Sequence, residues 1–195
     1  MKRPVIIAIT GGIGSGKSVI CKVLRAWGYD VFNCDYEAKM IMDADGAIKR
    51  RLCDEIATEI LIDDMIDRRR LAEIVFSDKE KLSILNGIVH QAVRDRFANW
   101  VSDHTDHKIV FVETAILYSS GMNADIDYEW RVSASEKVRI DRVIKRNGLS
   151  ARQVKDRMAS QLAEETVQPD LIIINDGHKA VSPQLLTALR HYLKS

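Results

Sequence analysis

The stretch Gly11-Gly12-Ile13-Gly14-Ser15-Gly16-Lys17-Ser18 decides how this chain folds. It follows a short apolar run at residues 5–10 that is rich in β-branched side chains, as is typical of a buried parallel strand. Apolar residues then recur at helical spacing over residues 19–27. The order strand, glycine-rich turn and helix predicts a tight loop whose backbone N–H groups converge on one point.

A loop of this kind binds phosphate groups. The stretch fits G-x-x-x-x-G-K-[ST], the P-loop pattern, and the helix that follows adds partial positive charge. We expect Lys17 to reach the β- and γ-phosphates of a nucleoside triphosphate, and the Ser18 hydroxyl to hold Mg²⁺. A turn that only joins a strand to a helix is the alternative, but the pattern rarely falls by chance at the end of an N-terminal strand. The nucleotide-binding residues predicted in this part of the chain are Gly12, Ile13, Gly14, Ser15, Gly16, Lys17, Ser18 and Val19.

Length and composition limit the other possibilities. The chain has 195 residues, a net charge of +1, 46% hydrophobic and 29% charged residues, which is ordinary for one soluble globular domain. The near-neutral charge gives no reason to expect nucleic acid or an acidic membrane as a partner. No apolar stretch approaches the roughly 20 residues of a membrane span. An oligomer is possible, but the sequence does not require one.

The three cysteines also bear on the location of the protein. Cys21, Cys34 and Cys53 lack the spacing of a metal site and are odd in number. They are therefore interpreted as reduced thiols, which favours a cytoplasmic location.

The rest of the chain predicts an α/β fold of the P-loop kinase type. We expect a parallel sheet of about five strands, flanked by helices, with the glycine-rich loop at its carboxyl edge. Residues 1–35 and 108–195 form its core. The block at about residues 36–107 lacks strand signals and predicts an inserted helical lobe that holds a substrate, although helices that only cover the sheet are the alternative. The four strands expected after the first lie at residues 29–35, 108–113, 128–134 and 171–174, the last of them buried.

Two carboxylates are expected at strand tips on the loop edge. Asp35 could accept a proton from a hydroxyl group or help to place Mg²⁺, although an aspartate here could equally cap the next helix. Glu113 could act, like a Walker B carboxylate, on the groups that surround Mg²⁺ without binding the ion directly, or could simply be a polar residue at a strand end.

Arginines gather on a pair of helices around a turn at residues 147–148. Arg142, Arg146 and Arg157 could close over the triphosphate as part of a lid at about residues 147–165, although a solvated helix face is the plainer alternative for any one of them. A capping box opens the second helix, on which we expect Arg157 and Gln161 on one face, one turn apart.

Landmarks along nearly the whole chain are similar to those of the dephospho-CoA kinase family. The loop, Arg157 with Gln161, and Asn175 with Gly177 occur in the family's order. Many kinases share the loop, and the two residue pairs are more specific. Further landmarks are Gly28, the segment 33–35, Asp67-Arg68, Leu71, Val75-Phe76, Leu85-Asn86, His90, Arg142, Arg146 and Asp176.

The resemblance implies phosphorylation of the ribose 3′-hydroxyl of dephospho-CoA, with ATP as donor and Mg²⁺, in the last step of coenzyme A synthesis. Asp35 matches the family's aspartate base, with Lys17, Arg142 and Arg146 as further catalytic residues. Asn175 and Gly177 match a segment near the adenine of ATP. The implied substrate-binding residues are Asp35, His90, Arg157 and Gln161, and the implied metal-site residues are Ser18 and Glu113.

The sequence also departs from the family pattern in three places. Asn33-Cys34 stands where the family has Asp-Ala, so one carboxylate is missing before Asp35. Residues 115–119, Ala-Ile-Leu-Tyr-Ser, stand where the family has Pro-Leu-Leu-Phe-Glu, and Gln91 replaces a proline. None of these changes falls on the donor site.

Two other functions remain open on the sequence. Another small-molecule kinase, of the shikimate or nucleoside monophosphate type, is one of them. A shikimate-type kinase would share the loop and Asp35, but the long inserted lobe argues against it. A nucleoside monophosphate kinase should carry a guanidinium just after the second strand to bind the acceptor phosphate, and only Lys39 is near that position. A nucleotide-dependent switch protein without transfer activity is the other alternative, although a switch GTPase should carry an Asn-Lys-x-Asp motif.

Overall fold

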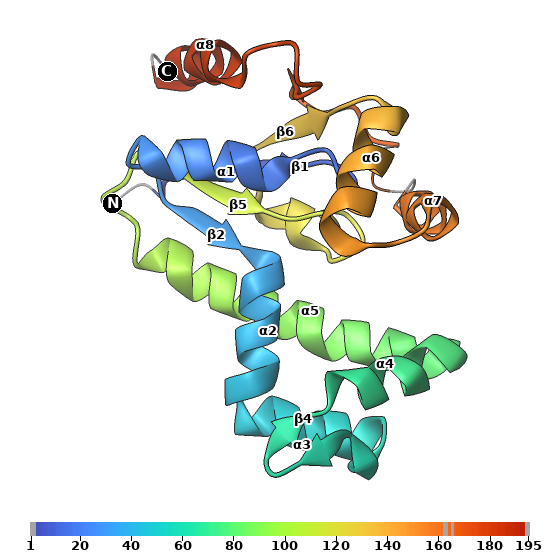
Figure 1. The fold of residues 1–195 in the computed structure, drawn as a ribbon. Helices are drawn as coiled ribbons and strands as arrows, with labels where there is room; N and C mark the ends of the chain where they lie inside the picture. The colour runs from blue at the N-terminus through green and yellow to red at the C-terminus, as the bar shows by residue number, and fades with distance from the viewer. Residues whose placement is uncertain (1–2, 162–163, 165, 194–195) are drawn as a thin grey trace. The chain divides into compact units, whose positions relative to one another are not determined.

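The computed structural model describes residues 3–161, 164 and 166–193, and these fall into two compact units (Figure 1). The first unit comprises residues 1–32 and 101–195, and the second comprises residues 33–100. Each unit is described separately below. Among the described residues, no helix combines the length and apolar character needed to cross a membrane.

A five-stranded sheet forms the centre of the first unit, with strand order β2-β5-β1-β6-β7. Strand β1 (Val5–Thr10) pairs in parallel with β5 (Ile109–Glu113) and with β6 (Tyr128–Ser133). Strand β6 pairs in parallel with β7 (Leu171–Ile174), and β2 (Val31–Asn33) lies at the other edge. The predicted fold class, a parallel sheet of five strands flanked by helices, is confirmed.

The main core lies on one face of this sheet. Alternate residues of the strands point to this face, and among them Ile9, Phe111 and Trp130 are each fully buried. The rings of Phe111 and Trp130 meet edge to face at 5.5 Å. Helices α1 (Lys17–Ala26) and α8 (Val181–Leu193) supply the opposing apolar side chains, including Leu24 and Leu185.

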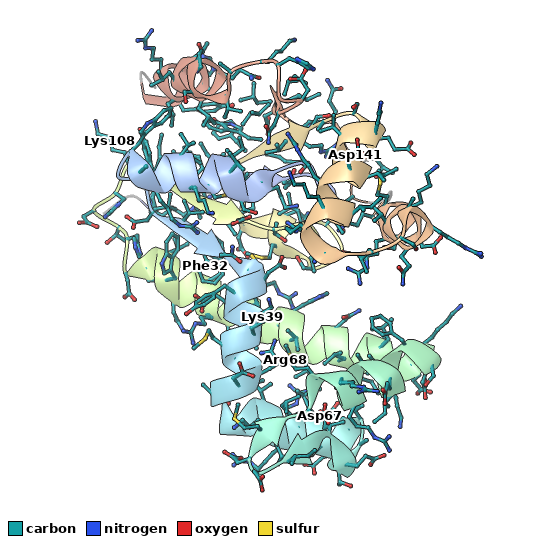
Figure 2. All side chains as sticks on the ribbon, in the orientation of Figure 1. Phe32, Lys39, Asp67, Arg68, Lys108 and Asp141 are labelled. Carbon is teal, nitrogen blue, oxygen red and sulfur yellow. The ribbon has the colours of Figure 1, made fainter. Side chains whose placement is uncertain are left out.

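Four helices build most of the second unit, and each begins where a polar side chain can cap it. The caps of the first three are Asn33, Asp45 and Asp67, while Asp78 accepts hydrogen bonds from the first turn of the fourth. Arg68 joins two of these helices, because its guanidinium donates to Asp43 at 2.8 Å and to the Lys39 carbonyl at 3.2 Å (Figure 2). The four helices are α2 (Cys34–Ala44), α3 (Gly46–Glu55), α4 (Arg68–Ser77) and α5 (Lys79–Ser102).

The expectation that this block lacks strands was wrong in one detail. After the short helix η1 (Thr58–Ile60), strands β3 (Leu61–Ile62) and β4 (Met65–Ile66) form a small antiparallel hairpin. Its two turn residues, Asp63 and Asp64, both have positive φ angles, of 48° and 62°. Aspartate tolerates this backbone region better than most residues, which is why a two-residue turn forms without glycine.

Two predicted strands also differ from the observed ones. The strand expected at residues 29–35 is limited to Val31–Asn33, because Asn33 accepts a hydrogen bond from the Tyr36 amide and starts α2. The strand expected to be buried, β7, lies at the sheet edge, and Ile172 within it is 53% exposed. A run of isoleucines therefore did not distinguish an edge strand from an interior one.

Candidate functional site

The glycine-rich loop joins β1 to α1 and turns sharply at its glycines. Gly14 and Gly16 have φ angles of 79° and 94°, and Gly16 is the cap residue before α1. A Cβ atom at Gly16 would lie 2.1 Å from the Asn175 side-chain nitrogen, so this position has no room for a side chain. The first turn of α1 then presents backbone N–H groups that have no partner within the helix.

Lys17 and Ser18, the side chains predicted to bind phosphate and metal, come directly after Gly16 in the chain. Lys17 Nζ donates to the Gly11 carbonyl at 2.6 Å, so the ammonium group spans the loop from end to end. Ser18 and Val19 are exposed in the first turn of α1, while Gly12 and Ser15 are buried. An exposed hydroxyl beside the lysine fits a metal that is shared with phosphate oxygens.

Three side chains bind carbonyl groups in the second half of the loop, residues 13–16. We call Arg139, Arg142 and Asn175 the arginine clamp. Arg139 Nε donates to the Ile13 carbonyl at 3.0 Å. Arg142 Nη1 donates to the Asn175 carbonyl at 2.9 Å and lies within 3.3–3.4 Å of the Ser15 and Gly14 carbonyls. Asn175 Nδ2 donates to the Ser15 carbonyl at 3.1 Å. Both arginines come from α6 (Glu136–Asn147), one turn apart.

The structure thus places Arg142 under the loop, and the other predicted lid arginines elsewhere. Arg146 donates to the Asn147 side chain at 2.8 Å, and Arg157 is exposed on α7 (Ala151–Ala159). The capping box expected at the start of α7 is present. Gly177 is exposed in the turn after β7. Residues 162, 163 and 165 of the predicted lid lie outside the described residues.

The placement predicted for Gln161 was wrong, since α7 ends at Ala159 and Gln161 therefore does not share that helix with Arg157. Its side-chain oxygen instead accepts a hydrogen bond from the Ile13 amide at 2.8 Å. Because Gln161 lies beyond the end of α7, its side chain can turn toward the glycine-rich loop. If α7 continued through Gln161, the side chain would lie on the same face as Arg157.

A second group of polar residues, buried or half-buried and not identified in the sequence analysis, lies at the first half of the loop, Gly11 and Gly12. Glu129 Oε1 accepts from Thr10 Oγ1 at 2.5 Å and from Arg131 Nε at 2.9 Å, and Glu129 Oε2 accepts from the Tyr118 hydroxyl at 2.6 Å. Glu164 accepts from the Tyr118 and Ser119 amides at 2.8 and 3.0 Å. We call Thr10, Tyr118, Glu129, Arg131 and Glu164 the Glu129 network.

The network has an electrostatic consequence. Burial, together with the hydrogen bond to Glu129, raises the pKa of Tyr118 to about 12. The hydroxyl therefore remains a donor throughout the neutral range. The available signal in the sequence was the alternation of charged and apolar residues at 128–132, which made this strand appear weaker than the others.

Glu113 ends β5 and is buried, at 7% exposure. Burial and the Glu113 charge raise the pKa of the neighbouring Cys21 thiol, so Cys21 is not a reactive thiolate. Within the described residues, no three His, Cys, Asp or Glu side chains are grouped to hold a metal ion by themselves.

Asp35 and His90 belong to the second unit. Asp35 is exposed in the first turn of α2, and its side chain is not the cap, because Asn33 fills that position. The helix-cap alternative for Asp35 is therefore wrong. His90 is half-buried in the middle of α5.

A comparison with protein families places this chain. A model described as dephospho-CoA kinase matches residues 5–180. This chain belongs to the dephospho-CoA kinase family. A dephospho-CoA kinase of Bacteroides fragilis is 34% identical over 197 residues, covering 97% of this chain and 96% of the relative. One from Porphyromonas gingivalis is 35% identical over 185 residues, covering 93% and 91%.

Solved structures agree on the fold. A crystal structure of a Thermus thermophilus protein superposes with a TM-score of 0.84 at 32% identity, over 98% of this chain and 99% of the other. A dephospho-CoA kinase from Campylobacter jejuni gives a TM-score of 0.68 at 23% identity, over 95% of both chains. A shikimate kinase from Bacteroides thetaiotaomicron gives 0.55 at 14% identity, over 98% and 99%, and these two likenesses concern the fold alone.

One departure from the dephospho-CoA kinase pattern can now be seen in place. Tyr118 and Ser119, where the family pattern has Phe-Glu, are the two residues whose amides Glu164 holds. Tyr118 also supplies the hydroxyl that bonds to Glu129. This chain therefore lacks the family's carboxylate at position 119 but has a buried carboxylate, that of Glu129 on β6, bonded to the neighbouring Tyr118.

Proposed function

We propose that this chain transfers the γ-phosphoryl group of ATP to the ribose 3′-hydroxyl of dephospho-CoA, giving coenzyme A and ADP. The observation that carries the proposal is a complete phosphate-binding loop in a chain of this family: Lys17 spans the loop, and the arginine clamp holds its carbonyl side. The shikimate and nucleoside monophosphate alternatives are not favoured by the family match.

The chain's own groups divide the work of the reaction. The loop amides and Lys17 bind the β- and γ-phosphates and offset negative charge as it moves toward the leaving ADP. In the acceptor, the 3′-oxygen forms the new bond to the γ-phosphorus as the bond from that phosphorus to the β,γ-bridging oxygen breaks. Asp35 takes the proton of the 3′-hydroxyl, a role that its exposed carboxylate can perform.

The remaining predicted residues complete the proposal. Gly177 and Asn175 flank the adenine, while His90, Arg157 and Gln161 contribute to the acceptor side. Arg146 and Arg142 stabilise the transferred charge, Arg142 through the loop that it holds. Mg²⁺ would be held by Ser18 with Glu113 behind it, and would neutralise phosphate charge when bound. The three free cysteines, two of them buried, suit a reducing cytoplasm.

The test is ATP turnover with dephospho-CoA, beside shikimate, AMP and CMP, in the wild type and in Asp35→Asn. We expect only dephospho-CoA to stimulate ADP formation, with 3′-phosphorylated product. Loss of the base should lower kcat by about 10²–10⁴-fold while ATP binding is retained. Asp54→Asn, which changes an exposed aspartate on α3 of the same unit, is the matched control. ATP binding without turnover on any acceptor would favour the switch protein instead.

A further inference from the structure

Strand β6 carries a charged pair where an interior strand usually carries apolar residues. It lies between β1 and β7, and its residues Glu129 and Arg131 lie on one face, with side chains only 6% and 12% exposed. Trp130 between them is fully buried in the core on the other face. Strands covered on both faces are normally continuous apolar runs. A buried ion pair rarely stabilises a fold more than apolar residues of the same size would, so folding alone does not account for this pair.

The Glu129 carboxylate is held firmly in one orientation. Its two oxygens accept from Thr10, from Tyr118 and from both the Nε and Nη2 nitrogens of Arg131, with Arg131 Nη2 at 2.8 Å. Four donors on one carboxylate satisfy nearly all of its acceptor sites. Any displacement of Glu129 would therefore break several bonds at once.

This carboxylate connects the start of the phosphate loop to two other segments. Thr10 directly precedes Gly11 and pairs with Arg131 in the sheet register. Tyr118 brings in the segment after β5, whose amides Glu164 also holds, and Arg131 Nη2 donates to the Glu164 carbonyl at 3.2 Å. A small pocket beside Gly11 and Gly12 is lined by these same side chains.

The charges in this pocket argue against a second phosphate site. The Arg131 guanidinium is already paired with the Glu129 carboxylate, and the Glu164 carboxylate also lines the pocket. The Glu129 amide donates to the Asp170 carboxylate at 2.7 Å. A bound phosphate would meet an excess of negative charge here. The network is therefore a frame for the loop and not a subsite for an anion.

We propose that Glu129 is a positioning residue for phosphoryl transfer: through Thr10 and Tyr118 it fixes the first half of the phosphate loop relative to the segment after β5. This rests on the proposed kinase function. The arginine clamp holds the second half of the loop separately, and in the proposed function the donor phosphates lie where this half leads into α1. Loosening the network should therefore misalign the transfer while ATP still binds.

The experiment removes the charged pair without leaving a buried charge. In the double variant Glu129→Val with Arg131→Val, neither charge is left buried without its partner, but the hydroxyls of Thr10 and Tyr118 lose their acceptor. We therefore expect a folded protein with a lowered melting temperature. We expect kcat/KM for dephospho-CoA to fall about tenfold or more, because small misplacements of reacting groups are costly. The Kd for ATP, measured by calorimetry, should stay within about twofold of the wild type.

A milder variant covers the case in which the double variant does not fold. Tyr118→Phe removes one hydroxyl, and we expect kcat/KM to fall several-fold with ATP binding unchanged. Tyr192→Phe is the matched control, since this tyrosine packs beside Trp130 on the other face of the sheet.

The outcomes separate the two proposals. Wild-type kcat/KM in a folded double variant, or in Tyr118→Phe, would overturn the positioning role and leave the kinase function intact. Equal losses of kcat/KM and of ATP affinity would also overturn it, because they indicate general loosening. Absence of transfer activity in the wild type itself would refute the kinase function first.

Discussion

The two halves of the phosphate loop are held in chemically opposite ways. The arginine clamp approaches the second half with positively charged or amide nitrogens, which donate to the carbonyls of Ile13, Gly14 and Ser15. The Glu129 network meets the first half with an ion pair that is nearly neutral and carries a surplus carboxylate in Glu164.

This difference matches what each half must do. The second half leads into α1, where the proposed function puts the phosphates, so cations bound to its carbonyls add positive charge at that end of the loop. The first half needs a fixed position but no attraction for anions, since phosphate bound there would compete with productive binding. A balanced ion pair provides rigidity without a net positive field.

The largest expected effect comes from forcing a side chain into the clamp. In Gly16→Ala the new Cβ would lie 2.1 Å from Asn175 Nδ2, at a residue whose φ is 94°. The loop must shift away from the clamp, and the backbone strain adds about 1–3 kcal/mol. We expect ATP binding, measured by calorimetry, to be weakened by about 100-fold or more.

Gly28→Ala is the matched control for this substitution. Gly28 has a similar φ of 87° after the other end of α1, but nothing lies within 4 Å of its Cβ position. It should lose stability from strain while it keeps ATP affinity. Equal effects of the two substitutions on ATP binding would show that strain, and not the contact with Asn175, decides the affinity.

A smaller effect is expected when the clamp keeps its charge but loses its shape. Arg142→Lys retains the cation, yet a lysine side chain is one atom shorter. Its ammonium therefore stops short of the point from which Arg142 Nη1 contacts the carbonyls of Gly14, Ser15 and Asn175. We expect the Kd for ATP to rise by about tenfold, with little change in the melting temperature. Arg152→Lys, which alters an exposed arginine on α7, is the control. Unchanged affinity in Arg142→Lys would mean that charge alone maintains the loop.

The same contrast explains how far the sequence could predict the structure. The loop, its strand and its helix are local, so spacing along the chain was enough to predict them, and Lys17 and Ser18 follow from it. The arginine clamp was predicted in part: Arg142 and Asn175 were identified as family landmarks, but they were assigned to the ligand and not to the carbonyls under the loop.

The Glu129 network could not be predicted because it depends on register. Thr10 and Arg131 are neighbours only because β1 and β6 pair in parallel with that offset, and residues 119 positions apart in the chain meet in the bond from Thr10 to Glu129. Short-range errors have a different cause. Asn33 starts a helix by capping it, and Gln161 falls just past a helix end, where periodicity no longer constrains direction.

The smallest expected effect concerns the stability of the network in alkali. The pKa of Tyr118 is raised to about 12 in the folded chain, mainly by burial and then by the bond to Glu129, against an ordinary value near 10. A raised pKa means that the folded state holds the phenol proton more tightly than the unfolded state does. The stabilisation is therefore complete below pH 10 and is lost as the pH rises toward 12. Urea unfolding at pH 9 and pH 11 should show a smaller loss of stability in Tyr118→Phe than in the wild type, with the exposed Tyr36→Phe as control. An equal loss in all three proteins would mean that Tyr118 ionises as easily in the folded chain as in the unfolded one, and that its bond to Glu129 does not hold the network together.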